Sequence, residues 1–167
     1  MRVIVMGVTG CGKSSVGAAL AAALGYEFAD ADDFHPPANV AAMSAGIALT
    51  DDDRWPWLDV VGAWMASRAD VVVACSALKR SYRDRLRTAA GATVFLHLSA
   101  PQSVIEQRVH RRTEDEGHFA GVALVNSQYA TLEPLCFDEP GGSIDVTHLS
   151  VTQTAAEAAD IVALQDD

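Results

Sequence analysis

The sequence predicts an α/β domain with three layers, in which helices cover both faces of a five-stranded parallel sheet. Three observations lead to this fold class. The chain has 167 residues, and a single domain usually has about 100–200. Short apolar runs alternate with helical stretches, which is the pattern of parallel strands joined by right-handed helical crossovers. The first apolar run and the first helical stretch flank a glycine-rich segment, Gly-Val-Thr-Gly-Cys-Gly-Lys-Ser at residues 7–14. We expect residues 1–167 to form one domain whose ligands bind beyond the carboxyl ends of the strands.

The strands are predicted from short runs of mainly apolar residues. In chain order, these runs are residues 3–6, 27–30, 71–75, 93–98 and 144–149. Because helical stretches separate the runs, we expect neighbouring strands to pair in parallel.

The helices are predicted from apolar spacing and from residues that begin a helix. In chain order, the helical stretches are residues 15–24, 38–45, about 57–67, 78–89, 101–112, about 122–132 and a last one that begins at 154. The acidic run at 51–54 opens the third stretch. Ser99 with Gln102, and Thr154 with Glu157, have the spacing of capping boxes. These pairs predict the first turns of the fifth and the last helix.

The charge of the chain argues against nucleic acid and anionic membranes as partners. The formal net charge is −10, and both of those partners are themselves anionic. Of the twelve lysines and arginines, five lie within residues 79–87 and three within 108–112. We interpret these two groups as binding small anions, with two solvated helix faces as the alternative. No apolar run approaches the roughly 20 residues of a membrane span.

Cysteine and histidine patterns indicate a cytoplasmic protein without zinc. The three cysteines form no C-x-x-C pair, which fits a reducing cytosol without disulfides. The five histidines show no H-x-x-x-H spacing, which argues against a zinc site. The first predicted strand begins at residue 2 or 3, so we expect no signal or transit peptide.

The segment at residues 7–14 fits the phosphate-binding pattern G-x-x-x-x-G-K-[ST] at every fixed position. In such a loop, backbone N–H groups turn inward around a phosphate, and the N-terminus of the following helix adds partial positive charge. Lys13 would reach the β- and γ-phosphates, and the Ser14 hydroxyl would complete a Mg²⁺ shell. We therefore predict a nucleoside triphosphate site. The alternative, an ordinary glycine turn, is disfavoured by the strand–loop–helix context.

Acidic residues follow the second predicted strand, at the end where ligands are expected. Side chains alternate along an extended chain, so Asp30 and Asp32 are predicted to point one way and Asp33 the other. One carboxylate could orient Mg²⁺ through water, and another could accept a proton from an attacking hydroxyl. The third strand ends in Cys75 and Ser76, where many P-loop proteins have an aspartate. Asp30 or Asp32 is therefore the candidate magnesium carboxylate, with an acidic turn as the alternative.

Three cations are candidate ligands for an anionic substrate. Acidic residues at 51–53 suit a helix N-terminus on dipole grounds alone, so a structural role is as good an interpretation as a functional one. Arg54 is disfavoured there by the same dipole and is expected to have a ligand or a carboxylate partner. Lys79 and Arg83 are four residues apart, so on one helical face they could grip one anion together.

Residues 108–121 are interpreted as a lid that closes over a triphosphate and excludes water. Arginines flank a polar loop that contains Gly117. For Arg111 and Arg112, the alternative role is capping of a helix C-terminus. His118 is either a packed residue of the lid or a substrate ligand.

Five segments together resemble the gluconokinase family of small P-loop carbohydrate kinases, which are distant relatives of shikimate and adenylate kinases. They are residues 7–14, 30–36, 49–58 (Leu-Thr-Asp-Asp-Asp-Arg-Trp-Pro-Trp-Leu), 75–84 (Cys-Ser-Ala-Leu-Lys-Arg-Ser-Tyr-Arg-Asp) and 117–119 with 127–134. The glycine loop alone is shared by many families, whereas its combination with the third and fourth segments is much more specific. The resemblance spans residues 3 to about 134 and implies a P-loop kinase fold similar to shikimate and adenylate kinases.

The resemblance implies the reaction ATP + D-gluconate → ADP + 6-phospho-D-gluconate, with ATP and Mg²⁺ as cofactors. The implied catalytic residues are Lys13, Asp32 (as base or as the carboxylate that orients the hydroxyl) and Lys79. The implied substrate ligands are Asp32, His35, Arg54, Lys79, Arg83 and His118. The implied nucleotide-binding residues are Gly7, Val8, Thr9, Gly10, Cys11, Gly12, Lys13, Ser14, Ser15, Arg111 and Arg112. The implied metal-binding residues are Ser14 and, through water, Asp30. Members of the family commonly dimerise, so a homodimer is a further expectation.

Two segments depart from the family pattern, and two other functions compete with it. Residues 113–116 make the expected lid longer and more acidic, and the tail after Pro134 matches no motif, so the adenine pocket is not assigned. One competing function is a kinase for another small anionic hydroxy acid such as shikimate, although shikimate kinases typically have three glycines where residues 75–77 are Cys-Ser-Ala. The other is a regulatory module that binds nucleotide without chemistry, which an intact Lys13, Ser14 and Asp32 argue against.

Overall fold

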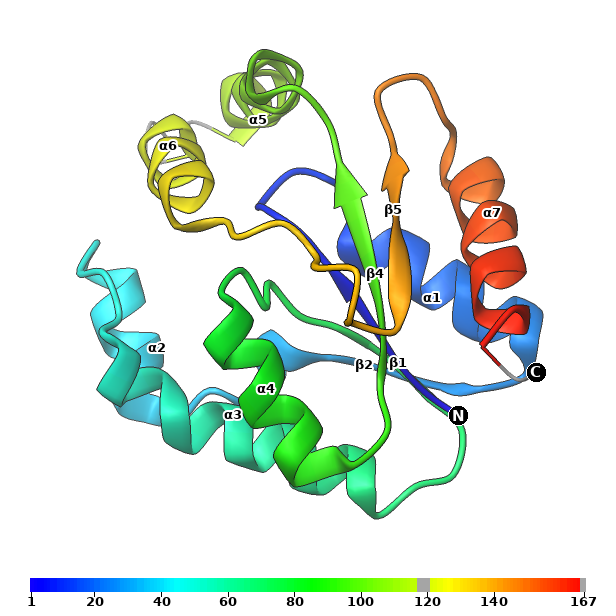
Figure 1. The fold of residues 1–167 in the computed structure, drawn as a ribbon. Coiled ribbons are helices and arrows are strands. Elements are labelled where there is room, and N and C mark those ends of the chain that lie inside the picture. Colours follow the sequence, from blue (N-terminus) through cyan, green and yellow to red (C-terminus); the bar gives the residue numbers. More distant parts are fainter. Residues whose placement is uncertain (117–120, 166–167) are drawn as a thin grey trace.

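A five-stranded parallel sheet forms the centre of the molecule (Figure 1), with the strand order β2-β3-β1-β4-β5. The structure is a computed structural model that describes the backbone of residues 1–116 and 121–165, and the side chains of residues 1–111 and 122–165. The strands are β1 (Arg2–Met6), β2 (Glu27–Asp30), β3 (Val71–Ala74), β4 (Val94–Ser99) and β5 (Gly141–Asp145). Each neighbouring pair is parallel, as predicted. The strand that leads into the glycine-rich loop, β1, is therefore the central one.

Helices cover both faces of this sheet, which confirms the predicted three layers. They are α1 (Lys13–Leu24), α2 (Pro37–Ser44), α3 (Asp51–Ala66), α4 (Arg80–Ala90), α5 (Gln102–Glu116), α6 (Gly121–Thr131) and α7 (Val151–Ala163), with a 3-10 turn η1 (Ala31–Phe34) after β2. One face of the sheet packs against α1 and α7, and the other packs against α3 and α4. Figure 1 shows α5 and α6 beyond the carboxyl end of β4.

The central strand shows why the sheet is apolar on both sides. Val3 and Val5 belong to the core on one face, Ile4 and Met6 belong to the core on the other, and all four are fully buried. Because both faces of this strand are covered by helices, none of these four side chains reaches solvent, and together they form a continuous apolar run.

The fifth strand lies at Gly141–Asp145 and not at the predicted residues 144–149. Gly141 has a φ of +128°, and a Cβ at this position would lie 1.9 Å from the carbonyl oxygen of Phe95. Only glycine lets the chain enter the sheet so close to β4. The glycine pair that resembles a turn in the sequence is thus the start of the strand, and the apolar Val146 packs into the core from the loop that follows.

The predicted start of the last helix is wrong because other residues provide its cap. The last helix begins at Val151, where Ser150 and Gln153 form the capping box, and Thr154 lies inside its first turn. Helix α5 begins at Gln102, within one residue of the predicted start, and the Ser99 hydroxyl donates to the carbonyl of Ile144 at 3.3 Å. By contrast, the acidic run does open α3, through a capping box between Thr50 and Asp53.

Helix α5 continues to Glu116, so the polar residues 113–116 are helical and not part of a loop as predicted. Glutamate is a good helix former, and that propensity prevails over the unfavourable dipole of an acidic C-terminus. The described helices include none that is both long and apolar enough to cross a membrane.

Candidate active site

The glycine-rich loop folds back on itself between β1 and α1. Its glycines have positive φ angles: Gly7 +144°, Gly10 +81° and Gly12 +95°. At Gly7 a Cβ would lie 2.8 Å from the carbonyl oxygen of Leu98, so only glycine fits between the loop and β4. Lys13 is the first residue of α1, and its ammonium group donates to the carbonyl of Val8 at 2.9 Å. A lysine held over a glycine loop at a helix N-terminus is the arrangement that binds phosphate.

The carboxylate of Asp30 joins this loop to the end of β2. One of its oxygens accepts from the Ser14 hydroxyl at 2.5 Å, and the other accepts from the backbone N–H of Asp32 at 3.0 Å. Asp30 thereby caps η1, and the chain does not stay extended. The predicted alternation of Asp30, Asp32 and Asp33 is therefore wrong, although Asp30 and Asp32 do belong to one cluster with the loop.

The Ser14–Asp30 pair fits Mg²⁺ by the chemistry of its donors. Mg²⁺ prefers hard oxygen ligands, and it usually takes one or two from the protein together with phosphate oxygens and water. Among the residues that the structure describes, no group of three or more His, Cys, Asp or Glu side chains could hold a metal ion. An ion held by Ser14 and Asp30 would take its remaining ligands from phosphate oxygens and water.

Asp32 has the position and the electrostatics of a proton acceptor. Its side chain is 84% exposed. Partial desolvation by the surrounding protein and the negative charge of Asp30 raise the pKa of Asp32, against the opposing charges of His35 and Lys13. A carboxylate with a raised pKa is a stronger base toward an attacking hydroxyl.

His35 is a neutral ring whose proton faces Asp32. The ring stacks on Trp57 with centroids 4.1 Å apart, and its Nε2 lies 3.8 Å from Asp32 Oδ1. The amide nitrogen of Asn39 donates to the carbonyl of Asp53 at 3.0 Å and lies 3.3 Å from His35 Nδ1. Because that carbonyl orients the amide, Nδ1 is the acceptor and the proton is on Nε2. Burial lowers the pKa of His35, which keeps the ring neutral.

Lys79 and Arg54 form a second cluster around Asp51 and Tyr82. Lys79 donates to both oxygens of Asp51 at 3.0 Å, and the Tyr82 hydroxyl donates to the same carboxylate. The Arg54 guanidinium lies 5.6 Å from the centroid of the Tyr82 ring. Hydrogen bonds from Tyr82 and Lys79 lower the pKa of Asp51, so its charge offsets that of Lys79. Within the described residues no carboxylate pairs with Arg54, whose charge is left for an anionic ligand.

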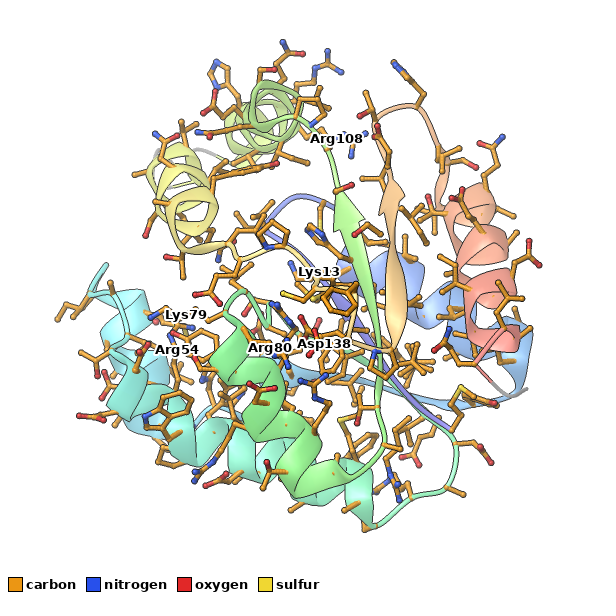
Figure 2. All side chains as sticks on the ribbon, viewed as in Figure 1. Lys13, Arg54, Lys79, Arg80, Arg108 and Asp138 are labelled. Carbon is orange, nitrogen blue, oxygen red and sulfur yellow. The ribbon has the colours of Figure 1, made fainter. Side chains whose placement is uncertain are left out.

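The two clusters lie on one continuous edge of the molecule. His35 Nε2 lies 3.8 Å from Asp32 Oδ1, and Asn39 contacts both the His35 ring and the carbonyl of Asp53, the residue before Arg54. Figure 2 shows Arg54 and Lys79 next to each other, with Lys13 nearer the strands. A molecule that contacts Arg54 at one end can therefore present its other end to Asp32 and the phosphate-binding loop.

Arg83 is not placed to bind a substrate, which corrects the prediction from its spacing to Lys79. The side chain is fully buried and forms two hydrogen bonds with Glu139, at 2.7 and 2.9 Å. Its other N–H groups donate to backbone carbonyls, those of Ala77, Leu78, Glu133 and Pro134. All five donors of the guanidinium are thus used inside the protein. Lys79 also precedes α4, as its N-cap, so the two cations do not share a helical face.

Most of the cations predicted to bind small anions form internal contacts instead. Arg80 pairs with Asp84 and Asp138, Arg85 with Asp59, Arg87 with Asp84, and Arg108 donates to the carbonyls of Val146 and Thr147. Figure 2 shows Arg80 and Asp138 together, below the lysine of the phosphate-binding loop. Clustering in the sequence therefore reflects helices that are tied to neighbouring segments by internal contacts. Arg54 lies outside the two groups, and among the described residues it has no carboxylate partner.

The structure leaves the predicted lid residues untested. The Arg111 side chain is exposed on α5, while the Arg112 side chain and His118 lie outside the described residues. The residue that does reach the loop from this region is Gln128 on α6, whose Oε1 accepts from the backbone N–H of Thr9 at 2.5 Å.

Sequence reasoning missed the roles of Asn39, Tyr82 and Gln128. The four-residue spacing of His35 and Asn39 could have indicated a contact across one turn of chain. Nothing local could have indicated Tyr82, because its partner Asp51 is 31 residues away. The contact between Gln128 and Thr9 joins residues 119 positions apart, which no spacing rule covers.

Comparison with known proteins finds similarity along most of the chain. The model of the AAA domain family matches residues 3–135. A protein of Gluconobacter oxydans named gluconokinase is 45% identical over 141 residues, which cover 82% of this chain and 78% of that protein. The thermosensitive gluconokinase of Escherichia coli is 39% identical over 162 residues, which cover 93% and 85% of the two chains.

A solved structure extends the similarity to three dimensions. The crystal structure of a gluconokinase from Sinorhizobium meliloti has a TM-score of 0.89 and 47% sequence identity to this chain. The match covers 98% of this chain and 92% of the other. The similarity therefore includes the tail after residue 134, which matched no motif.

Proposed function

The chain belongs to the gluconokinase family, and we propose that it performs the reaction of that family at the edge described above. The enzyme transfers the terminal phosphoryl group of ATP to D-gluconate and forms 6-phospho-D-gluconate. One observation carries the assignment of the site: Asp30 contacts both Ser14 of the phosphate-binding loop and the backbone of Asp32. That contact holds a basic carboxylate beside the place where a transferable phosphate binds.

Lys13 and Asp32 divide the chemistry between the two reacting groups. The Lys13 ammonium and the loop N–H groups neutralise charge on the phosphate oxygens, which is the main task in phosphoryl transfer. The Asp32 carboxylate orients the acceptor hydroxyl and receives its proton. The Nε2–H of His35 faces Asp32 and limits the directions in which that carboxylate can turn. Ser14 and, through water, Asp30 would hold Mg²⁺, which supplies further charge neutralisation when it is bound with ATP.

Arg54 is the proposed ligand for the carboxylate of gluconate. Lys79 is already paired with Asp51, whereas Arg54 lies over an aromatic ring without a carboxylate partner among the described residues. Lys79 then contributes donors to the hydroxyls of the substrate through the hydrogen-bonded group that it forms with Asp51 and Tyr82. This division replaces the pair of Lys79 and Arg83 that spacing predicted.

Further features of the proposal follow the family and stand apart from the chemistry. They are a homodimer, a cytoplasmic location, and a lid over residues 108–121 in which Arg111, Arg112 and His118 approach the ligands. Sedimentation of the protein would test the dimer.

The proposal is tested by the choice of acceptor. Release of ADP is measured with Mg·ATP and gluconate, shikimate, a nucleoside monophosphate or glucose as the acceptor. We expect the highest kcat/KM with gluconate, because Arg54 pairs with a carboxylate while Asp32 addresses the hydroxyl at the far end. A kcat/KM for glucose comparable to that for gluconate would contradict the proposal, since the charge of Arg54 would then not contribute to binding of the acceptor. A higher value with shikimate would favour the competing hydroxy-acid kinase.

A further inference from the structure

The carboxamide of Gln128 reaches from α6 to the phosphate-binding loop and has no task in the mechanism above. Its Oε1 accepts from the backbone N–H of Thr9 at 2.5 Å. Thr9 lies in the middle of the loop, between the glycines at positions 7 and 10. The contact therefore brings a polar side chain to the rim of the phosphate site from a helix that is distant in sequence.

The hydrogen bond with Thr9 determines which end of the carboxamide faces outward. The amide has an acceptor oxygen and an –NH₂ group that only donates. Because the Thr9 N–H requires an acceptor, the oxygen is turned to the loop, and the –NH₂ group is held beside it on the same carbon. In the part of the chain that the structure describes, no acceptor is bonded to this –NH₂ group. Two N–H donors are thus presented at the rim of the loop.

The backbone that carries Gln128 is anchored on both sides. Val125 is fully buried in the core, and the Tyr129 hydroxyl donates to the carbonyl of Ala100 at 2.8 Å. Beyond the helix, the N–H of Glu133 donates to the carbonyl of Leu78 at 2.8 Å. These contacts fix the end of α6 against two other parts of the protein. Donors held in place in this way need little reorganisation to bind charge, which is the condition for electrostatic catalysis.

We propose that Gln128 is a catalytic residue whose –NH₂ group donates to an oxygen of the terminal phosphoryl group of the nucleotide. Anionic oxygens suit a group that only donates, and the loop that Gln128 touches is the part of the site that binds phosphate. The acceptor is recognised elsewhere, by Arg54 and the cluster around Asp51. The proposal rests on the proposed function only in requiring a nucleoside triphosphate at the loop, not in requiring gluconate.

The test compares nucleotides with and without the terminal phosphoryl group. Gln128→Glu preserves the shape and keeps an oxygen for Thr9, but it replaces the donors with a negative charge. Dissociation constants for Mg·ATP and Mg·ADP are measured by titration calorimetry with the full chain and without gluconate. We expect the affinity for ATP to fall by roughly 10- to 150-fold, the range for a hydrogen bond to a charged group, and the affinity for ADP to stay unchanged.

Two further variants make the comparison decisive. Asn126→Ala changes another polar residue of α6, whose side chain contacts Gln102 and not the loop, and it should leave both affinities unchanged. Gln128→Met removes the donors without adding charge, and it also removes the acceptor for Thr9. If the glutamate variant does not fold, a loss of affinity in the methionine variant that is greater for ATP than for ADP supports the proposal.

The remaining outcomes overturn the proposal. Equal loss of affinity for ATP and ADP would make Gln128 a tether that shapes the loop. Unchanged affinity for both, together with an unchanged KM for gluconate in steady-state assays, would remove it from the site. Normal nucleotide binding with a raised KM for gluconate would assign the donors to the acceptor. Failure of the proposed function looks different, because gluconate would then not be phosphorylated by the wild-type enzyme while the difference between ATP and ADP persists.

Discussion

The environments of Arg54 and Arg83 decide what each arginine can do. The guanidinium of Arg83 is fully buried, and all of its N–H groups donate to Glu139 or to backbone carbonyls. It therefore ties α4 to the loop that precedes β5. The guanidinium of Arg54 rests on Tyr82 with its N–H groups directed to no carboxylate of the described residues. Spacing suggested that Arg83 binds substrate, because a partner 56 residues away leaves no local signal.

Arg83→Met should destabilise the protein strongly. It leaves the Glu139 carboxylate buried without its partner, and breaking a buried ion pair in this way costs about 3–5 kcal/mol. Chemical denaturation measures the free energy of unfolding. The double variant with Glu139→Leu should recover part of the loss, because no buried charge then remains unpaired. A single variant with wild-type stability would contradict the assigned structural role.

Arg54→Met should raise the KM for gluconate and leave the protein as stable as the wild type. Loss of one charged hydrogen bond changes affinity by roughly 10- to 150-fold. The KM for ATP should stay nearly unchanged, because Arg54 lies away from the phosphate-binding loop. Steady-state kinetics with each substrate varied in turn measure both constants. A normal KM for gluconate would mean that Lys79, and not Arg54, binds the carboxylate of the substrate.

Asp32→Asn should lower kcat while gluconate still binds. The amide keeps the shape of the side chain but cannot accept the proton, and general-base catalysis contributes roughly 10²–10⁴-fold. Single-turnover kinetics at saturating gluconate isolate the chemical step from product release. A rate near that of the wild type would move the base role to Asp30 or remove it.

At the scale of helices and strands, the elements with strong local signals are the ones that the sequence predicts well. The strands β1 and β2, the glycine loop and the start of α3 follow from apolar runs, glycines and a run of acidic residues. Both limits of β5, the end of α5 and the start of α7 were misplaced, because a close tertiary contact, helix propensity and a competing cap decide them. Gly141 shows this most clearly, since only the neighbouring Phe95 explains why a glycine begins a strand there.

Gly141→Ala should be far more destabilising than Gly25→Ala. Both glycines have positive φ angles, +128° and +71°, and an alanine in the left-handed region costs about 1–2 kcal/mol. At Gly25 nothing lies within 4 Å of the added Cβ, whereas at Gly141 the Phe95 carbonyl oxygen lies 1.9 Å away. Thermal unfolding of the two variants separates the clash from the backbone cost. Equal shifts in melting temperature would contradict the close approach of β5 to β4.

For the whole molecule, the strand order is what brings the functional residues together. Placing β1 between β3 and β4, with β2 next to β3, puts the loop, Asp30, Asp32 and the start of α4 at one edge. The sequence could predict which residues follow the strands, and hence Lys13, Ser14 and Asp32. It could not predict the strand order, and therefore not the contacts of Asp51 with Lys79 or of Gln128 with Thr9.

Stability of the whole molecule should fall as the solution is acidified below neutral pH, before carboxylates are protonated. Burial lowers the pKa of His35 and of His97, and for His97 the positive charge of Arg83 adds to the effect. A histidine whose pKa is lowered by folding contributes stability above its unfolded pKa of about 6.5, and that contribution is lost as the pH falls toward the folded value. Each histidine can lower the free energy of unfolding by at most about 1.4 kcal/mol per pH unit.

The measurement is the free energy of unfolding at pH 7.5 and 5.5 and at constant ionic strength, for the wild type and for His97→Gln. We expect the wild type to lose stability between the two values, and the variant to lose less because one of the two titrating rings is absent. Carboxylates with lowered pKa values, such as Glu139 beside Arg83, add their own loss only at lower pH, since they bind protons in the unfolded chain first below about 4.5. A His97→Gln curve that falls as steeply as the wild-type curve between pH 7.5 and 5.5 would mean that His97 is protonated as readily in the folded protein as in the unfolded chain.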